Sequence, residues 1–102
     1  MERYAVPMEI NLLSKYYNRY RKAIREYSMG IGNYKKSEIK LYASIVKRLE
    51  YVAACLEENQ RLIIVNEVFE RRSNKWYMGY MSEATYYRHR KNAFETFVER
   101  LN

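Results

Sequence analysis

The residues of this chain best suited to chemistry lie in the stretch 80–91, which reads YMSEATYYRHRK. Ser82 is a typical N-cap residue, because its side-chain oxygen can accept a hydrogen bond from a backbone N–H of the first helical turn. A helix that begins there carries two tyrosines and then the run RHRK at 88–91. Arginine and lysine pair with phosphates and guanine edges, and an α-helix fits the major groove of duplex DNA. The stretch therefore predicts a DNA-binding helix.

The alternative interpretation of this basic run is an ordinary solvated helix face. Its context favours DNA binding, because the run lies one turn past a capped helix start and follows a short turn and an apolar helix. Helical spacing puts Arg88 and Lys91 on an outer face with Tyr87. Arg90 lies one turn after Tyr86 on the inner side, so we expect it to be partly covered.

Side chains that catalyse reactions or bind metals are scarce. The chain has no aspartate, one histidine (His89) and one cysteine (Cys55). Metal-dependent nucleases, polymerases and hydrolases need clustered carboxylates or histidines, and His89 has no neighbouring carboxylate to orient it as a base. We therefore expect no enzymatic activity, no metal and no cofactor. Cys55 lies in the apolar run YVAACL, which predicts a small core residue.

Length and charge restrict the class of protein. A chain of 102 residues, 48% of them hydrophobic, predicts one folded domain over 1–102. The net charge of +7 favours a polyanionic partner, either nucleic acid or an acidic membrane surface. Residues 49–70 are acidic, with five glutamates against one arginine, and the segments on both sides are basic. The chain shows no signal-peptide pattern and no apolar run of membrane-spanning length, so a cytoplasmic protein without a membrane segment is expected.

The first half of the chain predicts a helical hairpin over 8–57. Two segments, separated by the glycine-containing loop 28–36, each repeat apolar residues at alternating spacings of three and four. The first stripe is Ile10, Leu13, Tyr17, Tyr20, Ile24 and Tyr27, and the second is Ile39, Tyr42, Val46, Leu49, Ala53 and Leu56. Such a pair suggests two antiparallel helices, with a homodimer through the hairpin as an open alternative.

The second half, 58–102, predicts the elements that hold the basic helix. Asn59 is a candidate N-cap for a helix over 60–72, and the helix that starts after Ser82 should run nearly to Asn102. Between them, a brief helix and turn over 73–81 contain Trp76, the expected hydrophobic anchor, and Tyr77, a candidate for exposed contact. No strand pattern of useful length occurs, so the sequence predicts an all-α fold of four to five helices.

The segment RLIIVNEVFE, followed by WYMGYMSEATYYRHRKNAFETFVERL, resembles the C-terminal part of the ArpU/RinA-like regulators of phage late genes. More distantly, it is similar to the promoter-binding C-terminal domain of bacterial sigma factors. The match covers about the last 45 residues. The residues that carry it are Arg61, Ile64, Phe69, Trp76, Ser82, Thr85, Tyr86, Tyr87, Arg88, Lys91, Ala93 and Leu101. This sequence departs from the usual sigma-like motif just before the serine, where Tyr80 and Met81 replace a small and an aliphatic residue.

The resemblance implies a sigma-like helix-turn-helix and a sequence-specific transcription regulator of phage or mobile-element origin that binds double-stranded DNA. It implies base-facing positions at Glu83, Ala84, Tyr87 and Arg88, with other positions nearer the phosphates. The complete predicted DNA-binding set is Lys75, Ser82, Glu83, Ala84, Thr85, Tyr87, Arg88 and Lys91. Two other functions stay open. One is a small-terminase-like or excision accessory DNA-binding protein; the other is a helical module that binds RNA polymerase through an acidic face of Glu57, Glu58, Glu67 and Glu70.

Overall fold

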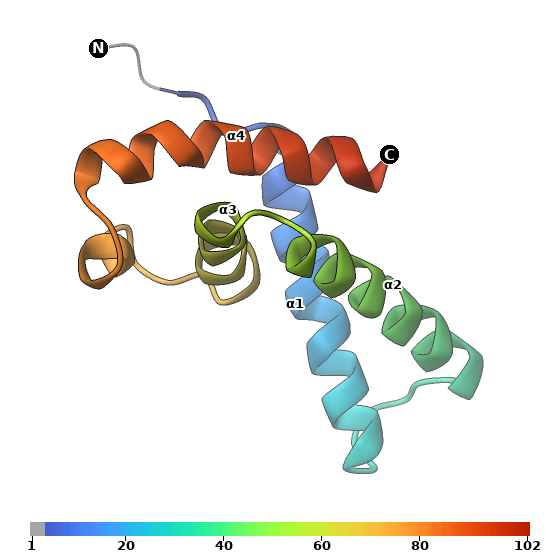
Figure 1. The fold of residues 1–102 in the computed structure, drawn as a ribbon. Coiled ribbons are helices and arrows are strands. Elements are labelled where there is room, and N and C mark those ends of the chain that lie inside the picture. Colours follow the sequence, from blue (N-terminus) through green and yellow to red (C-terminus); the bar gives the residue numbers. More distant parts are fainter. Residues whose placement is uncertain (1–3) are drawn as a thin grey trace.

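The computed structural model describes residues 4–102, and every regular element within them is a helix (Figure 1). The elements are α1 (Met8–Ser28), α2 (Lys36–Ala54), α3 (Glu58–Ile63), the π-helical turn η1 (Ile64–Phe69), the 3₁₀-helix η2 (Trp76–Gly79) and α4 (Glu83–Leu101). The all-α fold with four to five helices is thereby confirmed. No helix in this part of the chain has the length and apolar character needed to cross a membrane.

The helices α1 and α2 form the predicted hairpin, and their loop lies at the opposite end of the molecule from α4 (Figure 1). Gly30 and Gly32 adopt positive φ angles of 73° and 86°, which side chains other than glycine rarely adopt. A Cβ atom at Gly32 would also lie 2.6 Å from the Tyr34 ring. The two glycines therefore allow the tight reversal between the helices.

Most of both predicted stripes face the core, with one exception. Tyr27, in the last turn of α1, is 39% exposed, whereas Ala23 one turn earlier is buried. Cys55 is also exposed, which contradicts its prediction as a core residue. It is the C-cap of α2, where the chain turns toward α3, and its neighbours Ala53 and Leu56 are the residues that reach the core.

The third helix differs from its prediction at both ends. It begins at Glu58 with Glu57 as its N-cap residue, so Asn59 is not the cap. Negative charge in the first turn suits the positive end of the helix dipole, which explains the earlier start. The helix widens into η1, where the N–H of Glu70 bonds to the carbonyl of Val65, five residues back.

The helical segment also ends earlier than predicted, because Arg71 takes a left-handed conformation with φ 52°. This conformation costs a residue with a side chain about 1–2 kcal/mol. The N–H of Arg72 then bonds to the carbonyl of Asn66 at 2.8 Å, which closes the end of the helix. Glycine is the usual residue at such a helix end, so an arginine here is notable.

The connector 70–82 contains η2 as its only helical turn. Tyr77 is 9% exposed, which corrects its prediction as an exposed contact. Trp76 is partly buried and packs against the core, so the two residues share the anchoring role predicted for Trp76 alone. Three residues, 80–82, separate η2 from α4.

The helix α4 runs across the end of the hairpin and over α3 (Figure 1). Its inner face carries Ala93, Phe94 and Phe97, which are each at most 1% exposed. Phe97 packs edge-on against Phe69 of η1, whose ring stacks on Tyr17 of α1 at a centroid distance of 4.2 Å. Aromatic contacts thus join three elements in the core.

We expect Phe97→Ala to lower the free energy of unfolding by about 3–5 kcal/mol, because it removes a buried ring and leaves a cavity. Urea unfolding followed by circular dichroism measures the change. The matched control is Tyr51→Ala in α2, whose side chain is 71% exposed; its cost should stay within about 0.5 kcal/mol. Equal losses in the two variants would contradict this packing.

Candidate nucleic-acid interface

The start of α4 is fixed by the N-cap that the sequence predicts. The Oγ of Ser82 accepts a hydrogen bond from the N–H of Thr85 at 3.2 Å. The same hydroxyl donates to the Oγ1 of Thr85 at 2.9 Å. The Ser82 hydroxyl is therefore used as both donor and acceptor within the first turn, so Ser82 acts mainly to place the helix. Glu83 adds a negative charge at the positive end of the helix.

One face of the first half of α4 points to solvent. Ala84, Tyr87, Arg88 and Lys91 follow one another at spacings of three, one and three, and all four are exposed. Within residues 4–102, neither Arg88 nor Lys91 forms an ion pair or a side-chain hydrogen bond, so both charges are free to meet a partner. The face has the composition of a phosphate-contacting or base-contacting surface.

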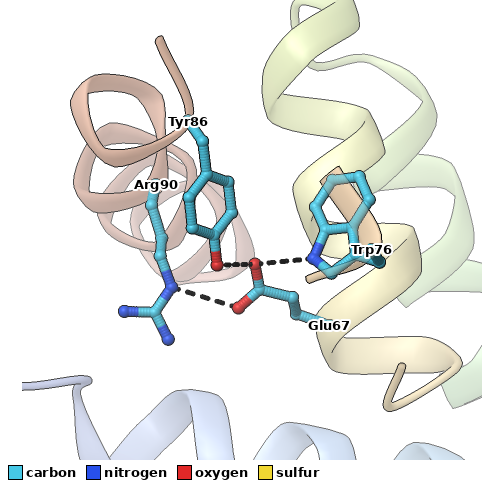
Figure 2. Close-up of polar contacts among 4 residues, drawn as sticks. All are labelled: Glu67, Trp76, Tyr86 and Arg90. Carbon is cyan, nitrogen blue, oxygen red and sulfur yellow. Dashed lines mark hydrogen bonds and ion pairs between the residues drawn. The ribbon is translucent and has the colours of Figure 1, made fainter. Parts of the chain in front are cut away.

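The opposite side of the same helical turns is attached to the core by one carboxylate, that of Glu67 in η1 (Figure 2). Its Oε2 accepts hydrogen bonds from the indole N–H of Trp76, at 3.0 Å, and from the hydroxyl of Tyr86. Its Oε1 pairs with the Nε of Arg90 at 3.1 Å. These four residues, here called the Glu67 junction, connect η1, η2 and α4.

Aromatic packing reinforces the junction. The Tyr77 ring of η2 stacks on the Tyr86 ring of α4 with centroids 3.9 Å apart and planes 8° apart. Trp76 meets the same ring edge-on at 5.9 Å. Such pairs contribute about 0.5–1.5 kcal/mol beyond their buried area. The short η2 is therefore held against the first two turns of α4.

Burial raises the pKa of the Tyr86 phenol, and the adjacent Glu67 carboxylate raises the pKa further, whereas Arg90 lowers it. In α1, burial and a hydrogen bond to Glu50 raise the pKa of Tyr17 to about 12. Both phenols therefore stay protonated in the folded protein well above the ordinary tyrosine pKa of about 10.

The structure brings most of the predicted DNA-binding residues to one end of α4. Those at 82–91 lie within its N-cap and first turns, and all of them are exposed except Thr85, which is half-buried. Lys75 is exposed but does not lie on α4, because it is the residue that precedes η2. The partial burial expected for Arg90 is confirmed, because its side chain is 23% exposed.

The role of Glu67 differs from its prediction as part of an exposed acidic face. Its side chain is only 14% exposed, although Glu57, Glu58 and Glu70 are exposed as that interpretation requires. A signal did exist, because Glu67 lies four residues after the buried Ile63 and so on the same helical face. A carboxylate on an apolar face needs a buried partner, and Arg90, expected on the inner side of the last helix, is a cation that can pair with it.

Comparisons with protein-family models, with curated proteins and with solved structures found no match to this chain.

We expect Glu67→Gln to lower the free energy of unfolding by about 1.5–3 kcal/mol, because an uncharged amide weakens three hydrogen bonds and leaves the Arg90 charge unpaired. The control is Glu70→Gln, only three residues away, whose ion pair with Arg72 is solvent-exposed. Its loss should stay within about 0.5 kcal/mol. Urea unfolding measures both, and a loss for Glu67→Gln as small as the control's would show that the junction contributes nothing.

The Tyr86 pKa predicts how stability depends on pH. Because the folded pKa is raised above the unfolded value of about 10, the stabilisation is complete below pH 10 and is lost as pH rises toward the folded value. Between about pH 9 and pH 11, the free energy of unfolding should therefore fall by about 1 kcal/mol less in Tyr86→Phe than in the wild type. Tyr51→Phe, at an exposed position, should match the wild-type slope. Urea unfolding at each pH gives the slopes, and equal slopes for all three proteins would contradict the assignment.

Proposed function

We propose that this chain is a sequence-specific duplex-DNA-binding transcription regulator, of the ArpU/RinA-like kind, that presents the first half of α4 to the major groove. The observation that carries this proposal is the division of residues 86–91. Tyr86 and Arg90 are held by Glu67. On the outer side, Tyr87, Arg88 and Lys91 are exposed, and neither Arg88 nor Lys91 has a hydrogen-bond or ion-pair partner among the described residues. A reading helix needs this combination of a fixed inner side and an unpaired outer side.

The elements before α4 also support a helix-turn-helix. Three residues separate η2 from α4, which is the length of the turn in that motif. The first helix of the motif would then be η2, reduced to four residues, and α3 with η1 would support it from behind. The Tyr77–Tyr86 stack takes the place of the packing that a longer first helix provides.

In this role Arg88 pairs with a guanine edge or a phosphate, and Tyr87 contacts a thymine methyl or the backbone. Lys91 lies one turn further along and neutralises a phosphate. Lys75 contributes from the connector. The chain acts by binding and not by catalysis.

DNA binding is preferred to a polymerase-binding module because the acidic face proposed for that module includes Glu67, which is committed to the core. A homodimer is the oligomeric state that the hairpin favours. Met8, Leu12 and Tyr16 are exposed on α1 at spacings of four, so they form one apolar row. A dimer of this kind would read two half-sites.

The test compares the wild type with the double variant Arg88→Ala, Lys91→Ala in electrophoretic shift titrations on mixed-sequence duplex DNA at several salt concentrations. The variant should bind at least about tenfold more weakly. Its salt slope should be smaller by about two if both side chains contact phosphates, and by about one if Arg88 contacts a guanine edge instead. The control is Lys36→Ala, Lys40→Ala at the start of α2, which removes the same charge from exposed positions.

If the two double variants weaken binding equally, net charge and not the α4 face accounts for binding, and the proposed interface is wrong. If the wild type fails to bind duplex DNA at low salt, the proposed function is wrong.

A further inference from the structure

A second cationic feature lies on the inner side of α4, away from the proposed reading face. A groove of about 630 Å³ opens between α1, η1 and α4. Its walls carry three cations, Lys15, Arg71 and Arg90, against the single carboxylate of Glu67. Both oxygens of that carboxylate already accept hydrogen bonds from Trp76, Tyr86 and Arg90. The groove therefore has an excess of two positive charges.

The side chain of Arg71 is positioned by a buried serine. Its Nε donates to the Oγ of Ser14 at 2.9 Å, and the same Oγ donates to the carbonyl of Val68 at 2.7 Å. Ser14 is 8% exposed, so its hydroxyl is sheltered from water, whereas Arg71 itself is exposed. It connects the left-handed helix end to α1 and holds the guanidinium of Arg71 at the groove wall.

Arg90 also lines the groove and is held in a similar way. Its Nε pairs with Glu67, and its guanidinium carbon lies 4.9 Å from the centre of the Phe94 ring. Figure 2 shows the two terminal nitrogens of Arg90 directed away from the carboxylate. Among the described residues, no hydrogen bond or ion pair uses the terminal nitrogens of either Arg71 or Arg90.

Two arginines fixed through Nε, each with its terminal nitrogens unpaired, form the arrangement that binds tetrahedral oxyanions. We propose that this groove binds a phosphate group between Arg71 and Arg90, with Lys15 adding charge and the amide of Asn11 a further donor at the rim. The phosphate belongs either to a small phosphorylated molecule or to a backbone position of bound DNA. Binding of a small phosphate does not depend on the proposed DNA-binding function.

The conformation of Arg71 supports a role for its side chain. Glycine would adopt φ 52° without strain, and it would still allow the N–H of residue 72 to close the helix end. An arginine at this position is thus unfavourable for the backbone, and its side chain lines the groove together with Lys15 and Arg90. The substitution Arg71→Gly therefore removes the side chain proposed to bind phosphate and relieves backbone strain, so the variant is expected to fold.

The first measurement is a titration of the wild type with inorganic pyrophosphate and with inorganic phosphate, against sodium chloride at equal ionic strength, followed by the NMR signals of the arginine Nε–H groups. The signals of Arg71 and Arg90 should shift saturably. Arg71→Gly should weaken pyrophosphate binding by about tenfold or more. The matched control is Arg72→Ala, which removes the same charge from the neighbouring exposed residue and should bind as the wild type does.

The second measurement is the salt dependence of duplex-DNA binding by the same three proteins. If the wild type binds neither small phosphate but Arg71→Gly lowers the salt slope by about one and Arg72→Ala does not, the groove holds a DNA backbone phosphate. If Arg71→Gly matches the wild type in both measurements, the proposal is overturned. If the wild type binds pyrophosphate but no DNA, the phosphate site stands and only the DNA-binding function fails.

Discussion

The arrangement of the N-terminal half of α4 depends on the burial of one carboxylate. Glu67 lies among apolar side chains of η1, and an unpaired charge there would cost several kcal/mol. Its partners come from η2 and from the first two turns of α4. Because the carboxylate must be satisfied, the rotation of α4 about its axis is fixed. That rotation directs Arg88 and Lys91 outward.

The rotation of α4 and the separate contact of Arg71 with Ser14 leave two different cationic surfaces on the two sides of α4. Outward, Arg88 and Lys91 are ordinary exposed charges whose long side chains are not held by any described residue. Inward, Arg90 and Arg71 are each held through Nε by a polar partner, Glu67 and Ser14 respectively. A flexible pair suits contacts along a DNA backbone, whereas a fixed pair suits one compact anion.

Most of the predictions that fail do so where regular α-helical periodicity stops. Tyr77 lies in a short 3₁₀ turn outside the α-helical stripes, so no periodic pattern in the sequence places it in the core. Cys55 lies in the turn after α2, where the apolar run YVAACL continues although the helix has ended. The third helix ends before Arg71, because a π turn and a left-handed residue leave no compositional signal in a sequence that has arginine where glycine is usual.

The sequence by itself determined the helices, most of their buried faces and the start of α4. These depend on local contacts, such as the Ser82 hydroxyl with the N–H three residues later, and local contacts leave periodic or capping patterns. Only the tertiary structure decided the Glu67 junction and the Arg71–Ser14 contact, whose partners lie 9 to 57 residues apart. Such pairings depend on how the packed helices cross and rotate, and no spacing in the sequence records that geometry.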